Sequence, residues 1–64
     1  MTRYIVYLPS HTHDPLPIGT LDHRAAANQA VLQLDGSGKE TFYSVAAAMN
    51  SVQRRYPSAF AEEA

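Results

Sequence analysis

The sequence has 64 residues, with five Lys and Arg, six Asp and Glu, a formal charge of −1 and no cysteine. A chain of this length predicts one domain over residues 1–64 that buries roughly 60% of its unfolded surface, with little room for a deep cleft. The absence of cysteine excludes disulfide frameworks, thiolate metal sites and thiol nucleophiles. The near-neutral charge argues against tight nonspecific nucleic-acid binding, which needs several phosphate contacts.

The first element predicted is a strand, "RYIVYL", from Arg3 to Leu8. It is dense in β-branched and aromatic residues and stops at Pro9, and its two apolar faces indicate an interior position in a sheet. The apolar run has five residues, too few for a signal-peptide core or a membrane span. We therefore expect a soluble, cytoplasmic protein that does not enter a membrane.

The next eleven residues, "SHTHDPLPIGT", run from Ser10 to Thr20. Pro15, Pro17 and Gly19 disfavour both regular helix and central strand, so this segment is predicted to be an extended loop. Long loops often carry function, which directs attention to its two histidines.

The segment "TLDHRAAANQAVLQL" supports two interpretations. Its three consecutive alanines favour a helix from about Asp22 to Ala30, and the turn residues of "DGSGK" then favour a hairpin over residues 31–44. The alternative is one unbroken helix that continues to Leu34.

A second amphipathic helix is predicted in "SVAAAMNSVQRRYP". Ser44 is a suitable N-cap, apolar residues recur at helical spacing, and Pro57 stops the helix. Arg54 and Arg55 complement the helix dipole at its carboxyl end. Beyond it, Phe60 could reach the core, while Glu62 and Glu63 are expected to be solvated. The predicted fold class is α+β, with a two- or three-stranded, mostly antiparallel sheet packed against two helices.

The HxH pattern of "SHTHD" raises the question of a metal site. His11 and His13 would point to the same side of a strand, and Asp14 and His23 could complete a shell for zinc, nickel or copper. However, polar loop residues also serve solvation and local turns, and the catalytic folds that use HxH are far longer than this chain. We therefore expect no metal ligands and no cofactor, with a metal-binding protein as an alternative.

Other catalytic patterns are not formed. The serines lack a GxSxG motif, and "DGSGK" lacks the order of a phosphate-binding loop, so it is predicted to be a plain turn. The sequence therefore predicts a protein that is not an enzyme.

Aromatic and basic residues suggest a surface that binds another macromolecule. Tyr4, Tyr7, Phe42 and Tyr43 could stack single-stranded nucleic acid, although in a small protein they are expected to form the core and its rim. Tyrosine and arginine are favoured in protein interfaces. The interface candidates of these two types are Tyr7, Tyr43, Arg54, Arg55 and Tyr56.

Two stretches, "RYIVYLPSHTH" and "AAAMNSVQRRYP", resemble corresponding ends of small phage-encoded anti-CRISPR proteins that act on type I surveillance complexes. The shared features are a first strand ending in Tyr-Leu followed by Ser and His, and a helix carrying Ala-Met-Asn before an Arg-Arg pair. These stretches cover about a third of the chain, and the residues between them show no such likeness.

This resemblance implies a non-enzymatic inhibitor, a phage protein in the host cytoplasm, that binds the CRISPR ribonucleoprotein and blocks target DNA binding or cleavage. It would act as a monomer or a small homo-oligomer. Acidic residues could meet a basic groove that otherwise holds DNA, if they cluster in space. They are Asp14, Asp22, Asp35, Glu40, Glu62 and Glu63.

A second alternative is a small DNA-binding regulatory protein. It would read DNA with the last helix, through Asn50, Gln53, Arg54 and Arg55, but the sequence lacks a helix-turn-helix spacing and a broad basic surface. Direct DNA binding is therefore not expected.

Overall fold

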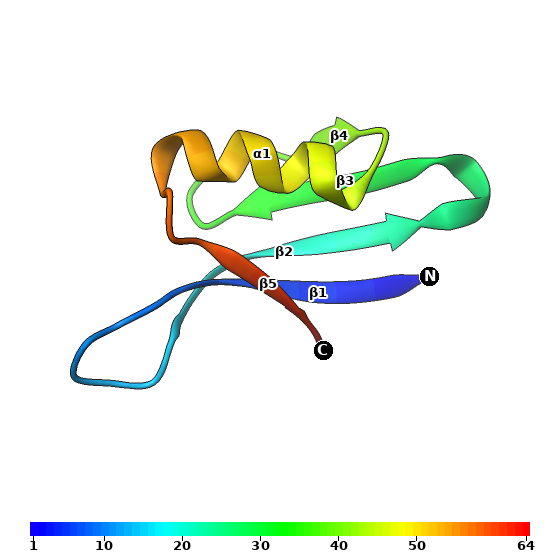
Figure 1. The fold of residues 1–64 in the computed structure, drawn as a ribbon. Coiled ribbons are helices and arrows are strands. Elements are labelled where there is room, and N and C mark those ends of the chain that lie inside the picture. Colours follow the sequence, from blue (N-terminus) through cyan, green and yellow to red (C-terminus); the bar gives the residue numbers. More distant parts are fainter.

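The computed structural model describes residues 1–64 as a five-stranded antiparallel sheet with one α-helix across one of its faces (Figure 1). The strands lie in the order β4-β3-β2-β1-β5, so the first and last strands of the chain are neighbours. Their bounds are β1 Thr2–Leu8, β2 Leu16–Arg24, β3 Gln29–Leu34, β4 Glu40–Phe42 and β5 Phe60–Glu63, and helix α1 spans Val45–Arg55. The α+β class is confirmed, but the predicted two or three strands and two helices are wrong in number.

Strand β1 confirms the predicted first strand and its interior position. It pairs with β2 on one side and with β5 on the other, both antiparallel. Val6 is fully buried under the helix, whereas Ile5 and Tyr7 lie on the opposite face and are half-buried. The two apolar faces of "RYIVYL" therefore belong to a strand with neighbours on both edges.

Strand β2 starts inside the segment predicted to be a loop. It begins at Leu16, so the connection between β1 and β2 is only residues 9–15. A β-bulge accommodates Pro17 and Gly19 in this strand. Val6 pairs with Gly19 and Tyr7 with Pro17, so Ile18 has no partner residue in β1 and packs against the core. A Cβ at Gly19 would lie 2.5 Å from the carbonyl oxygen of Gln33, so this close approach of β2 to β3 requires glycine.

The predicted helix over residues 22–30 is wrong, and so is its extension to Leu34. Residues through Arg24 continue β2, and the three alanines form only a 3-10 turn, Ala25–Ala27. Asn28 then adopts a left-handed conformation with φ of 50°, which reverses the chain into β3. Pairing of β2 with both β1 and β3 outweighs the weak helix preference of the alanines.

The hairpin predicted for residues 31–44 is confirmed. Strands β3 and β4 pair antiparallel from Ala30 with Phe42 to Leu32 with Glu40. Between them, the Ser37 amide donates to the Leu34 carbonyl, and Gly36 has a φ of 78°, which glycine adopts without steric cost.

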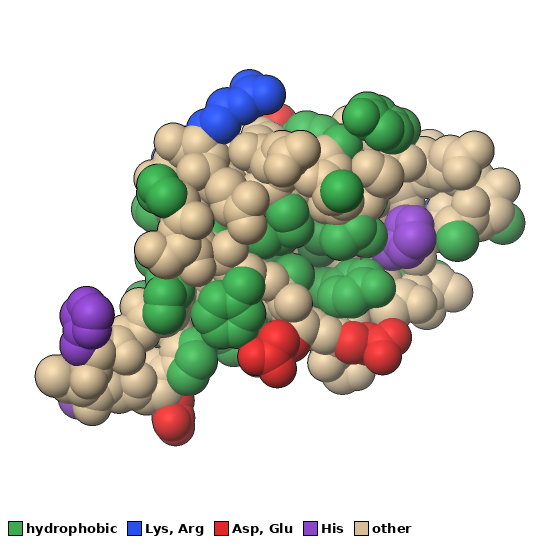
Figure 2. All heavy atoms as spheres, viewed as in Figure 1, with side chains coloured by type: hydrophobic (Ala, Val, Ile, Leu, Met, Phe, Trp, Pro, Cys, Tyr) green, Lys and Arg blue, Asp and Glu red, His purple; other side chains and the backbone are tan.

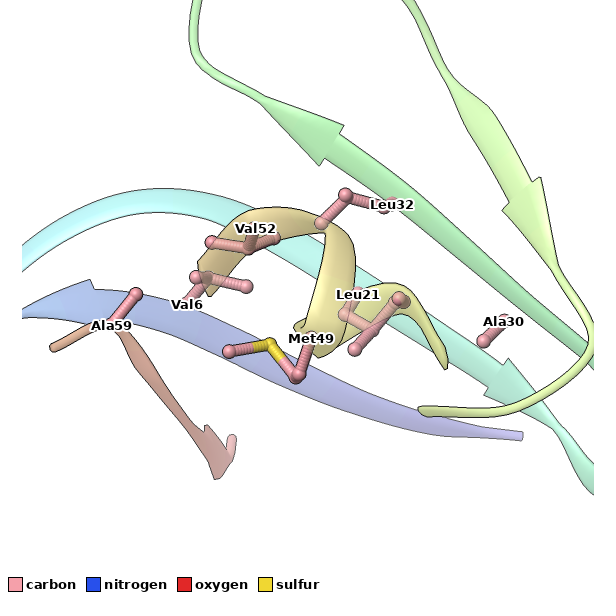
Figure 3. Packing of buried hydrophobic residues seen from close by; sticks show 8 residues of the cluster. Val6, Leu21, Ala30, Leu32, Met49, Val52 and Ala59 are labelled. Atoms are coloured by element: carbon pink, nitrogen blue, oxygen red, sulfur yellow. The ribbon is translucent and has the colours of Figure 1, made fainter. Parts of the chain in front are cut away.

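Helix α1 confirms the predicted second amphipathic helix. The Ser44 hydroxyl accepts a hydrogen bond from the Ala47 amide at 3.0 Å, which is the predicted N-cap. Ala48, Met49 and Val52 are the buried residues of this helix, and Figure 3 shows Met49 and Val52 pointing toward the sheet. The side-chain amide nitrogen of Gln53, near the end of α1, donates a hydrogen bond to the Ala59 carbonyl at 3.0 Å. This bond fixes the connection between α1 and β5.

The core lies between α1 and one face of the sheet. Figure 3 shows Met49 and Val52 of α1 among Val6, Leu21 and Leu32 from three adjacent strands. The prediction that Phe60 reaches this core is wrong, because Phe60 starts β5 and lies opposite Tyr7, on the sheet face away from the helix. The exposure expected for Glu62 and Glu63 is confirmed, although both belong to β5.

Candidate functional site

The sheet face opposite α1 carries no covering element, and we call it the open face. Antiparallel partners share a face, so the strand register places its side chains in three rows across the sheet. The rows are Arg3, Asp22, Val31 and Thr41; then Glu62, Ile5, Thr20 and Gln33; then Phe60, Tyr7 and Pro17. None of these residues is buried, whereas every buried strand residue lies on the helix face.

Two aromatic rings are stacked on the open face. The Tyr7 and Phe60 centroids lie 5.5 Å apart with an interplanar angle of 25°, and Tyr7 also pairs with Phe60 across β1 and β5. Ile5 lies in the adjacent row and extends the apolar surface. Partly exposed aromatic and aliphatic groups with polar neighbours are the composition that protein interfaces favour.

A bidentate ion pair crosses the same face. Arg3 donates from Nε to Asp22 Oδ1 at 2.7 Å and from its terminal nitrogen to Oδ2 at 2.9 Å. The hydrogen bond from Arg3 holds the pKa of Asp22 below its ordinary value, against a smaller opposing effect of burial. The positive charges of Arg3, Lys39 and Arg24 lower this pKa further.

Three of the predicted interface residues, Arg54, Arg55 and Tyr56, lie together at the end of α1. Arg54 and Arg55 are exposed in the last turn of α1, and the Arg55 guanidinium carbon lies 5.6 Å from the centroid of the Tyr56 ring. Arg55, Tyr56 and Asp35 line one small hollow of about 140 Å³ beside the β3–β4 turn. This cluster lies at the end of the helix rather than on the open face.

The other predicted interface residues are dispersed. Asp14 is exposed in the β1–β2 loop, and Tyr43, 77% exposed, lies between β4 and α1. Glu40 belongs to edge strand β4, whereas Glu62 and Glu63 belong to β5 at the opposite edge. Figure 2 shows carboxylates along the β5 rim and near the protruding loop rather than in one patch. The six acidic residues therefore do not form a single acidic face.

His23 is far from the other two histidines. His11 and His13 lie in the loop beyond Leu8, whereas His23 pairs with Thr2 at the other end of the β1–β2 ladder (Figure 2). The Ser10 hydroxyl accepts bonds from the Thr12 and His13 amides, at 3.4 and 3.3 Å, so it orders the loop locally. No group of three His, Cys, Asp or Glu side chains is placed to hold a metal ion.

The residues proposed for nucleic-acid reading do not converge. Tyr4 and Phe42 pack against the core, so Tyr7 alone of the four candidate aromatic residues lies on the open face. The Gln53 side chain is used in the hydrogen bond to the Ala59 carbonyl.

The structure contains no candidate membrane-spanning helix, since its one α-helix, α1, has only 11 residues.

The sequence interpretation missed Ile5, Gln33 and Phe60 as parts of the candidate site. The alternation in "RYIVYL" contained the signal for Ile5, because a strand covered on one face presents every second side chain on the other. Phe60 could not be placed until β5 was known to pair with β1.

The fold and this face define a small α+β domain with one covered and one uncovered sheet face. Comparison with protein-family models, curated proteins and solved structures gives no match to the chain.

Proposed function

We propose that the protein is a non-enzymatic inhibitor that binds a protein partner through the open face. The observation that carries this proposal is the stacked pair of Tyr7 and Phe60, partly exposed on a sheet face without a covering element. Aromatic anchors surrounded by polar groups supply most of the binding energy in many protein complexes.

The size of the molecule suits this role. A standard interface buries about 800 Å² on each partner, which is about one fifth of the accessible surface of 4404 Å². One face of a five-stranded sheet can supply such an area without a cleft. The β1–β2 loop and the exposed Asp14 lie next to this face and could extend the contact.

We propose a type I CRISPR surveillance complex as the partner, on the basis of the resemblance of the first strand and the last helix to anti-CRISPR proteins. The bound inhibitor would block target DNA binding or cleavage. Because the acidic residues are dispersed, the mode of binding that we propose is an apolar and polar contact at the open face rather than a broad imitation of DNA charge.

The test is capture of an affinity-tagged protein with purified type I surveillance complex, followed by a mobility-shift assay of the complex on labelled target DNA. The tag is placed at Met1, which is 80% exposed and lies at the other end of β1 from Tyr7. We expect stoichiometric capture and loss of the shifted DNA band.

The matched variants are Tyr7→Thr, which removes the ring and keeps a strand-forming residue, and Asn50→Ala on the exposed surface of α1. We expect Tyr7→Thr to weaken capture at least about tenfold, as for an interface hot spot, and Asn50→Ala to leave it unchanged. Circular dichroism checks that both variants fold, and Ile5→Thr replaces Tyr7→Thr if that variant does not. Absence of capture, or equal capture of folded wild type and open-face variant, would contradict the proposal.

A further inference from the structure

One end of the open face is hollowed beside Gly19 of β2 and the end of β3. The hollow has a volume of about 460 Å³, and Gly19 contributes backbone but no side chain to its wall. Its other lining residues include Ile5 from β1, Pro17 and Thr20 from β2, and Gln33 and Asp35 at the end of β3. It lies in the row next to Tyr7 and Phe60, so it is continuous with the proposed interface.

The lining combines unused polar groups with an apolar wall. The side chains of Thr20, Gln33 and Asp35 make no hydrogen bond within the chain. The single salt bridge of the molecule joins Arg3 to Asp22. Asp35 makes no salt bridge, although it also lines the small hollow that contains Arg55 and Tyr56. The lining contains one carboxylate and no cation.

We propose that this hollow binds an arginine side chain of the protein partner. This inference rests on the proposed function, because it names the side chain of the partner protein that the open face binds. The aliphatic stem of the arginine packs on Ile5 and Pro17, and its guanidinium reaches the Asp35 carboxylate, with the Thr20 hydroxyl and the Gln33 carbonyl as further acceptors.

A guanidinium suits this lining better than an ammonium or an anion. It presents five donors in a planar fork, which several acceptors around one hollow can satisfy together. Lysine offers a compact and strongly hydrated charge, which gains less from separated acceptors. An anion would meet the Asp35 carboxylate without a compensating cation in the lining.

The test is a titration of the isotopically labelled full chain with the peptide acetyl-Gly-Arg-Gly-amide, followed by amide chemical shifts in NMR spectra. The isosteric citrulline peptide, which is neutral, and the lysine peptide are the comparison probes. We expect saturable shifts at millimolar arginine peptide, centred on Thr20, Gln33, Asp35 and Gly36, with the lysine peptide weaker and the citrulline peptide without effect. Added salt should weaken the binding, because both charged groups are exposed to solvent.

The diagnostic variant is Asp35→Asn, with Glu40→Gln as its control on the outer strand β4. We expect Asp35→Asn to weaken arginine-peptide binding by about two- to fivefold, within the range for one exposed ion pair, and Glu40→Gln to change nothing. Equal binding of the citrulline peptide, shifts centred elsewhere, or equal losses in both variants would overturn the inference. If the arginine peptide binds as expected but the surveillance complex is not captured, the proposed partner is wrong and the arginine site stands.

Discussion

Arg3 and Asp22 show how a single pair of residues makes stability depend on pH. They face each other across β1 and β2, and Arg3 donates two hydrogen bonds to the Asp22 carboxylate. The pKa of Asp22 is therefore lower in the folded protein than in the unfolded chain. Such a carboxylate contributes stability above its unfolded pKa, and that contribution disappears as the pH falls through the lower, folded pKa.

We predict that Asp22→Asn lowers the melting temperature at pH 7, by a small amount because the pair lies at the surface. The difference from wild type should shrink as the pH falls below about 4, the ordinary pKa of an aspartate, and vanish once Asp22 is protonated in the folded protein. Thermal unfolding followed by circular dichroism between pH 7 and pH 2 measures this. Asp14→Asn removes an exposed loop carboxylate outside any salt bridge and is the control. A difference in melting temperature between Asp22→Asn and wild type that grows on acidification would contradict the lowered pKa of Asp22.

At the scale of the element, α1 depends on its first turn. The Ser44 hydroxyl accepts the Ala47 amide hydrogen, and the first turn contains no acidic residue that could assist at the amino end. The helix contributes Ala48, Met49 and Val52 to the core, so fraying of its start loosens the packing of the whole sheet.

We predict that Ser44→Ala lowers the free energy of unfolding by about 1 kcal/mol, the usual loss for an N-cap. Ser58→Ala, at an exposed serine whose side chain makes no hydrogen bond, should change it by less than about 0.5 kcal/mol. Urea denaturation of the three proteins gives both differences. Equal stabilities of Ser44→Ala and wild type would show that the cap is not needed.

The elements also differ in how well sequence predicts them. Strand β1 and helix α1 were predicted because propensity, pattern and stop signals agreed within each segment. Strand β2 is not predicted by its sequence, because Pro17 and Gly19 fit a strand only through the bulge at Ile18. The alanines after Arg24 form a turn rather than a helix because β2 and β3 pair on either side of them. On the open face, Tyr7 and Asp22 are among the interface residues that the sequence predicts. Phe60 and Gln33 reach this face through pairing between strands that local pattern does not encode.

The whole molecule has a very small core. Eight hydrophobic residues are buried, and the largest fully buried side chain is Leu21 in the central strand. At 0.05 to 0.15 kcal/mol per residue, a domain of this length has a total stability of about 3 to 10 kcal/mol. One large cavity can therefore remove most of it.

We predict that Leu21→Ala costs about 2 to 5 kcal/mol, because the side chain leaves a cavity beneath α1 that the short strands cannot fill. The variant should be largely unfolded at 37 °C by circular dichroism. Leu16→Ala makes the same chemical change at a residue that is 59% exposed, and it should remain folded. A stable Leu21→Ala variant would mean that the core is packed differently.

The pairing of β1 with β5 also has a consequence for folding in the cell. The segment Tyr4–Leu8 has high β propensity and no proline, and such a segment aggregates readily when its edge is exposed. Its protecting neighbour β5 lies more than fifty residues later in the chain, so this edge stays open on the ribosome until β5 has been made and has left the exit tunnel. Long-range closure of this kind slows folding, so the interval in which nascent chains are vulnerable to chaperone capture or aggregation is set by the last strand rather than by the first.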